Sequence, residues 1–281
     1  EEESRYADLV RNLRWSTKGD SGSAGSHGMG KAVYWAFSGF SSVFFNSVLP
    51  SKEELKEHDV SENPLVDFES PRLVGRAKLS THSDDSRVAY KDSGYFGKKR
   101  HDSETGKWVS SLRGDDAESA VKSLKMSRAS DVPGTTIMVP GFRHPSVSSL
   151  ESIGEIHDKF REAAAMNFWP AIMRGDLTVK VGEDEDEVEI DDFPELEPFA
   201  EILQAYNEDD YDDEFSDPGS VVRREVTLKM ADKKGDEETA EEATVTLLVR
   251  KPEMDESDEM VGKLAKFRGP GMIVDYDTKS G

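Results

Sequence analysis

Three glycines and a lysine near the N-terminus have the spacing of a phosphate-binding loop. Gly25, Gly28 and Gly30 form the pattern G-x-x-G-x-G, and Lys31 follows at once. Glycine lets the backbone pass close to an anion and adopt positive φ. The apolar run at 32–37 predicts a helix, whose first N–H groups and dipole also favour an anion. We therefore expect this loop to bind nucleotide phosphates. The expected binding residues are Gly25, Ser26, His27, Gly28, Met29, Gly30 and Lys31.

Two other interpretations fit the same residues. Gly25, Gly30 and Lys31 match the first seven positions of the P-loop pattern G-x-x-x-x-G-K-[ST]. Position 32 is Ala, however, so the hydroxyl that holds magnesium is missing. A P-loop also follows a buried strand, whereas residues 15–23 are mostly polar and rich in Gly and Ser. The second alternative is a glycine-rich hinge without a ligand, because glycine motifs alone are weakly specific.

The run from Gly25 through Ser47 resembles the second glycine box of the GHKL ATPases, the superfamily of gyrase B, heat-shock chaperone, histidine kinase and MutL. More narrowly, it resembles a prokaryotic subgroup found beside restriction and phage-defence genes. Residues 133–142 (PGTTIMVPGF) and 167–181 (NFWPAIMRGDLTVKV) match that subgroup too. The resemblance implies ATP bound under a mobile lid, with Gly134 and Thr135 opening a strand near the nucleotide. It also implies a defence role, with protein partners or an ATP-dependent homodimer.

The same resemblance places part of the ATP site before this chain. Family members carry an earlier helix with a catalytic Glu and a magnesium-binding Asn, then an Asp-containing glycine box that reads adenine. Neither motif occurs in the sequence, which begins at Glu1. We therefore expect a fragment of a longer ATPase, with no catalytic residue and no metal ligand of its own. ATP and Mg²⁺ would be the cofactors of the full-length protein, and the fragment alone would be inactive.

Charge divides the sequence unequally. The 281 residues carry a formal net charge of −22 and suffice for two domains. Residues 1–140 hold 20 basic and 21 acidic side chains, a net charge of −1, and residues 141–281 hold 16 and 37, a net charge of −21. The acidic half should repel a DNA backbone. Adaptation to salt would explain the acidity but not its asymmetry.

Other classes are excluded or disfavoured by composition. The absence of cysteine excludes disulfides and thiolate zinc sites. The six histidines lack ligand spacing, and the acidic runs at 183–187 and 209–214 lack the EF-hand pattern, so we interpret those runs as solvated loops. No apolar run approaches the ~20 residues that span a bilayer. With no visible signal peptide, a cytoplasmic protein is expected.

Hydrophobic periodicity predicts an α/β architecture in two parts. The resemblance to GHKL ATPases implies that residues 1–142 are the C-terminal portion of an α+β two-layer sandwich with helices on a mixed sheet. It also implies that residues 143–281 form a second, acidic α/β domain in the transducer position. We expect strands at 42–49, at 72–81 with Leu79 facing the core, and from Gly134. A turn is expected at Ser93-Gly94. A capping box at Ser148 and Glu151 should open a long helix that Pro170 kinks or ends.

The competing functional class is a non-catalytic scaffold whose acidic second half binds a basic partner. The three glycines and Lys31 discriminate against it, because a scaffold does not need an anion-binding loop.

Overall fold

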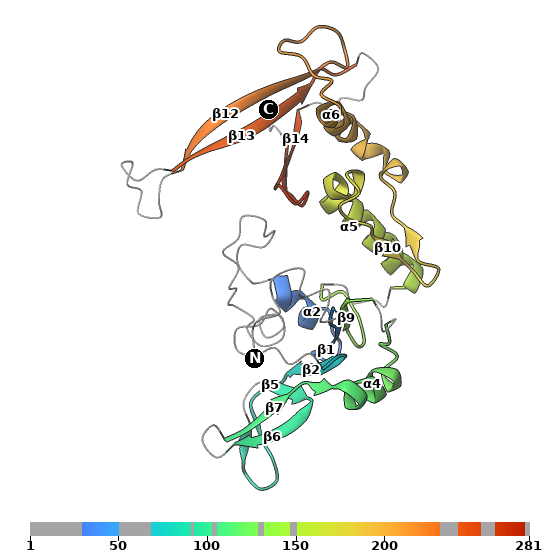
Figure 1. Ribbon diagram of the computed structural model, residues 1–281, viewed down its shortest axis with the longest axis vertical. Helices are drawn as coiled ribbons and strands as arrows, with labels where there is room; N and C mark the ends of the chain where they lie inside the picture. The colour runs from blue at the N-terminus through green and yellow to red at the C-terminus, as the bar shows by residue number, and fades with distance from the viewer. Residues whose placement is uncertain are drawn as a thin grey trace. The chain divides into compact units, whose positions relative to one another are not determined.

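The computed structural model describes residues 30–50, 69–90, 93–102, 106–128, 132–146, 151–230, 241–253 and 262–278 (Figure 1). The chain divides into two compact units, residues 1–151 and 152–281. The boundary expected between 142 and 143 falls inside the first unit. The expected mixture of helices and strands is confirmed in both units.

The first unit is built on an antiparallel sheet. Its central strand β1 (Ser42–Val48) lies between β2 (Arg72–Lys78) and β9 (Gly134–Met138). The short strands β5 (Ser93–Phe96) and β8 (Leu112–Arg113) pair with β2. All these pairs are antiparallel, so the expected mixed sheet is not seen among the described strands.

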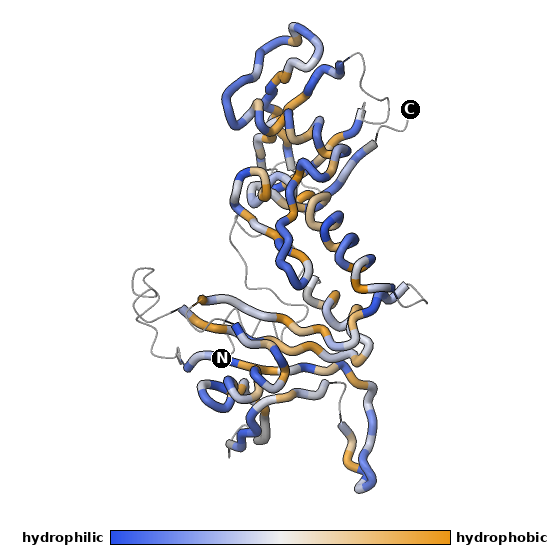
Figure 2. The backbone as a smooth tube through the Cα atoms, turned by 90° about the vertical axis from the view of Figure 1, so that its right-hand side faces the viewer, coloured by the Kyte–Doolittle hydropathy of each residue, from blue (hydrophilic) through white to orange (hydrophobic). Residues whose placement is uncertain are grey.

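Apolar side chains on both faces explain how the sheet is covered, and Figure 2 shows hydrophobic residues along its strands. On one face Val43 and Phe45 pack against Trp35 of the short helix α2 (Val33–Ala36). On the other face Leu73 packs against α4 (Gly114–Ser123). Described helices therefore lie on both faces, which departs from the expected two-layer sandwich. The physical reason is that β1 is buried at most positions, rather than at every second one.

Two details of this unit correct the sequence interpretation. Leu79 does not face the core: β2 ends at Lys78 and the Leu79 side chain is 43% exposed. Ser93 and Gly94 are not a turn but the first residues of β5, paired with β2. The remaining described elements are the hairpins of β3 (His82–Ser83) with β4 (Ala89–Tyr90) and of β6 (Lys98–Asp102) with β7 (Gly106–Ser110).

The second unit contains the long helix α5 (Ile153–Met173). Its capping box is not at 148–151 as expected. Ser152 Oγ accepts from the Glu155 N–H at 3.2 Å, and the Glu155 carboxylate accepts from the Ser152 N–H at 2.8 Å. Pro170 stands in the last turn, and Gly175 ends the segment with a φ of +72°.

The core of the second unit surrounds Trp169 of α5. The Trp169 indole N–H donates to Tyr276 Oη at 3.0 Å, and the Tyr276 hydroxyl donates to the carbonyl of Met166. Leu196 and Leu203 are buried in the same cluster. The other elements are β10 (Lys180–Val181), β11 (Asp186–Glu187), η2 (Ile190–Asp192), η3 (Pro194–Leu196), α6 (Glu197–Asn207), β12 (Val221–Met230), β13 (Glu241–Arg250), β14 (Lys263–Phe267) and β15 (Ile273–Thr278).

Within the described parts of the chain, no helix has both the length and the apolar character that crossing a bilayer demands.

Candidate nucleotide-phosphate site

Gly30 is the one glycine of the motif within the described residues. It begins the 3₁₀ turn η1 (Gly30–Ala32), which continues directly into α2. The helix that the apolar run at 32–37 predicts is therefore present, and it ends at Ala36. For Lys31 the structure describes the backbone alone. The rest of the motif lies outside the described residues: Gly25, Ser26, His27, Gly28 and Met29.

The surroundings of Gly30 are open. The residue is exposed, and a Cβ added there would meet no described atom within 4 Å. Among the described residues, the packing of the fold therefore does not require glycine at this position. Glycine here is compatible with the close backbone approach that a phosphate needs.

Hydrogen bonds and ring contacts fix the direction in which α2 runs along the sheet. At its end, the Arg143 N–H donates to the Phe37 carbonyl at 2.9 Å, and Ser38 Oγ donates to the Pro140 carbonyl at 3.0 Å. Those partners follow the carboxyl end of β9. One turn earlier, the rings of Tyr34 and Trp35 lie 6.2 and 6.0 Å from Phe45. The helix thus extends back along β1 from the Pro140 end toward its own N-terminus.

A row of three polar residues crosses the sheet beyond Phe45. Ser47 of β1 is paired with Arg72 of β2 on one side and with Thr135 of β9 on the other. Ser47 Oγ and Thr135 Oγ1 share a hydrogen bond of 2.9 Å. Side chains alternate between faces along a strand, so this row lies on the α2 face with Val43 and Phe45.

Two of the three residues in the row are buried. Ser47 is 5% exposed and Arg72 is 8% exposed, whereas Thr135 is exposed. The Arg72 Nε–H donates to the Glu69 carbonyl at 3.4 Å. The Arg72 guanidinium and one hydroxyl, the one whose proton is not used in the bond between Ser47 and Thr135, can donate hydrogen bonds to an oxyanion. The resemblance named Thr135 as a candidate and did not name Ser47 or Arg72, although alternation along the strands puts both on this face.

Gly134 has a packing role of its own. Its φ is +150°, and an added Cβ would lie 2.6 Å from Arg128 Nη2. Arg128 also donates to Thr136 Oγ1 at 3.5 Å, so its guanidinium lies across the start of β9. The fold therefore requires glycine at position 134, and the next residue, Thr135, belongs to the row of three polar residues.

Metal ligands do not gather among the described residues: no three His, Asp or Glu side chains there lie close enough to hold an ion. The described residues thus offer donors for an oxyanion but no ligand set for Mg²⁺.

No family model, curated protein or solved structure matches this chain. The likeness to GHKL ATPases consequently rests on the sequence motifs alone.

Proposed function

We propose that the first unit binds the phosphate groups of ATP between the glycine loop at 25–31 and the row of Ser47, Thr135 and Arg72. The observation that carries this proposal is the 2.9 Å hydroxyl pair of Ser47 and Thr135, with Arg72 paired to Ser47 on the next strand, at one end of the α2 face. Gly30 precedes Tyr34 by about one helical turn, so it lies toward the end of the α2 face that carries Ser47 and Thr135.

The chemistry of the two parts is complementary. The first N–H groups of a helical turn lack intrahelical acceptors and bind anions readily. Lys31 adds a positive charge beside these N–H groups. Thr135 offers an exposed hydroxyl on the other side of the proposed phosphate position. A phosphate held this way would meet backbone donors and side-chain donors together, as phosphate sites in proteins commonly do.

The proposal extends to a GHKL-type ATP-binding module of a restriction or phage-defence system, in which lid closure over ATP moves the second unit. The sequence motifs support it, while the antiparallel sheet with helices on both faces departs from what the resemblance implies. The two family motifs that would supply the general base and the magnesium ligands do not occur in these 281 residues, so we propose binding of ATP by this chain without hydrolysis.

The experiment compares two glycine substitutions in otherwise identical chains. At both Gly30 and Gly154 an added Cβ meets no described atom within 4 Å, so alanine should leave either fold intact. We expect Gly30→Ala to weaken ATP binding at least about tenfold, since the methyl group occupies space that the phosphate needs. Gly154→Ala lies in α5 of the second unit and should leave ATP affinity unchanged. Equal affinities in all three proteins would contradict the proposal.

The scaffold alternative predicts a different result. The turn between β10 and β11 and the start of β11 carry exposed acidic side chains, at Glu183, Asp184, Glu185 and Asp186. A surface for a basic partner would require such side chains. A chain that binds a polylysine peptide but no nucleotide would favour that function over ATP binding.

A further inference from the structure

The hairpin of β12 and β13 is a two-stranded ribbon of unusual length. Ten consecutive pairs join it, from Val221 opposite Arg250 to Met230 opposite Glu241. Among the described strands, each of the two pairs with the other alone (Figure 1). An isolated two-stranded hairpin is marginally stable in water, and a further strand on either edge would stabilise it.

The outer edge of β12 is already covered where the strand begins. The Asp212 N–H donates to the Val221 carbonyl at 2.9 Å, and the Arg223 N–H donates to the Asp212 carbonyl at 3.4 Å. Arg224 donates to the Asp213 carbonyl, which ties the same loop to the strand. A second strand cannot pair where this loop lies.

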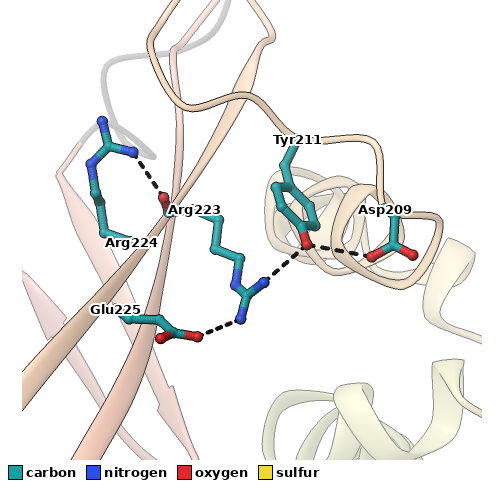
Figure 3. Close-up of polar contacts among 5 residues, drawn as sticks. All are labelled: Asp209, Tyr211, Arg223, Arg224 and Glu225. Atoms are coloured by element: carbon teal, nitrogen blue, oxygen red, sulfur yellow. Dashed lines mark hydrogen bonds and ion pairs between the residues drawn. The ribbon is translucent and has the colours of Figure 1, made fainter.

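Side chains hold the covering loop in place, as Figure 3 shows. Arg223 donates to Tyr211 Oη at 3.0 Å and to the Glu225 carboxylate at 2.6 Å. Its guanidinium also lies over the rings of Tyr206 and Tyr211, at 5.8 and 5.5 Å. Charged residues along an edge strand oppose pairing with another chain, so β12 carries two forms of protection.

The middle of the β13 edge has neither form of protection among the described residues. Residues 243–249 (ATVTLLV) are seven uncharged residues without glycine or proline, and most have high β-propensity. Val245 and Val249 are 45% and 38% exposed. An uncovered edge of this composition is a template for pairing with another strand.

The hydrogen-bond pattern identifies which groups face outward. The backbone of Lys251 faces inward, because its N–H donates to the carbonyl of Ser220, just before β12, at 3.0 Å. Ladder bonds alternate along an antiparallel strand, so Thr244, Thr246 and Leu248 direct their N–H and C=O groups to the free edge. On β12 the Asp212 bond to Val221 shows, by the same alternation, that Thr227 faces the opposite edge.

Charge indicates which partner can approach this edge. Residues 152–281 carry 15 basic and 36 acidic side chains, a net charge of −21, so two copies repel each other over most of that unit. The two strands of the hairpin carry four basic and three acidic residues, a net charge of +1. Repulsion between copies is therefore weak along these two strands.

We propose that a second copy of this chain adds its β13 antiparallel to this β13, with Thr246 on the two-fold axis. Val245 then stands opposite Leu247 of the second copy, and Ala243 stands opposite Val249, which shields apolar side chains across the new edge. The register also places the backbone of Glu241 opposite that of Lys251 of the second copy, so oppositely charged residues meet at each end of the new edge. The result is a closed dimer with a four-stranded sheet, because the protected β12 edges stop further addition.

Two identical substitutions on opposite edges test the proposal in the full 281-residue chain. Proline at Thr246 removes an outward N–H and no bond within the hairpin, and proline at Thr227 does the same on the β12 edge. We expect a dimer in sedimentation velocity whose dissociation constant rises at least about tenfold in Thr246→Pro, since both central bonds are lost. Thr227→Pro should dimerise like the wild type.

Hydrogen exchange of the wild-type chain gives a second measurement that needs no variant. Amides of residues 244–248 should gain protection as the concentration rises through the dimerisation range, and those of residues 223–227 should not. A monomer at every concentration would overturn the proposal. A dimer that Thr246→Pro leaves intact, or that Thr227→Pro weakens equally, would overturn it too.

Discussion

The hydroxyl groups of Ser47 and Thr135 lie 2.9 Å apart although 88 residues separate them in the sequence. Their contact joins β1 to β9 on the face that α2 covers. Replacing both residues should affect nucleotide binding more than it affects the fold. We expect Thr135→Val to lower ATP affinity several-fold with little change in stability, because Thr135 is exposed.

Ser47→Ala should lower the free energy of unfolding by about 1 kcal/mol, because Ser47 is buried and loses its hydrogen bond. A double-mutant cycle compares the wild type, the two single variants and the double variant, each measured by urea unfolding and by ATP titration. Additive effects on ATP affinity would mean that the pair does not act as one site.

Gly75 should be among the least replaceable residues of the first unit. An added Cβ would lie 2.7 Å from the Phe44 ring and 2.9 Å from Phe96 Cβ, inside the sheet. We expect Gly75→Ala to destabilise the protein by about 1–3 kcal/mol through overpacking, measured by urea unfolding. Gly154→Ala is the matched control and should be neutral or stabilising by up to about 1 kcal/mol, since Gly154 is helical with open space around it. Equal effects would refute the steric argument.

Tyr276 should contribute to stability through its hydroxyl. Tyr276→Phe removes the acceptor of the Trp169 N–H and the donor to the Met166 carbonyl, leaving both partners unsatisfied. We expect a loss of about 1–3 kcal/mol in the free energy of unfolding. Tyr90→Phe removes an exposed hydroxyl bound to Asp84 and should cost less than about 0.5 kcal/mol. Similar losses for the two variants would contradict the assigned role of Tyr276.

The start of α5 should depend on pH through Glu155. The backbone N–H of Ser152, followed by its hydroxyl, lowers the pKa of the Glu155 carboxyl below its ordinary value of 4.5. A carboxyl whose pKa is lowered by folding contributes stability that is complete above the unfolded pKa and is lost as pH falls through the folded one. The stability difference between wild type and Glu155→Gln should therefore be present at pH 7 and shrink below pH 4.5. A difference that persists unchanged in acid would exclude the capping contact as its cause.

Three expected strands correspond to the centre of the sheet in the first unit. The strands expected at 42–49, at 72–81 and from Gly134 are β1, β2 and β9, although β2 ends before Leu79. The capping box was misplaced because Ser148-x-x-Glu151 and Ser152-x-x-Glu155 fit the same pattern, and sequence alone does not choose between overlapping signals. Leu79 was assigned to the core by extending an alternation past the last paired residue.

The candidate site shows the same limit. Thr135 was identified from a motif, whereas Arg72 and Ser47 were not, because their place beside it depends on the register of three strands that are distant in sequence. No sequence pattern indicated that the Arg128 guanidinium lies close to Gly134.

Isothermal titration calorimetry of the chain with ATP is the most direct measurement of nucleotide binding. We expect saturable binding to the wild type without phosphate release, and loss of that binding in Gly28→Val, whose β-branched side chain would fill the phosphate space. Thr135→Val should retain weakened binding. Absence of ATP binding by the wild type, or an affinity that Gly28→Val leaves unchanged, would contradict the claim that the glycine loop holds nucleotide phosphates.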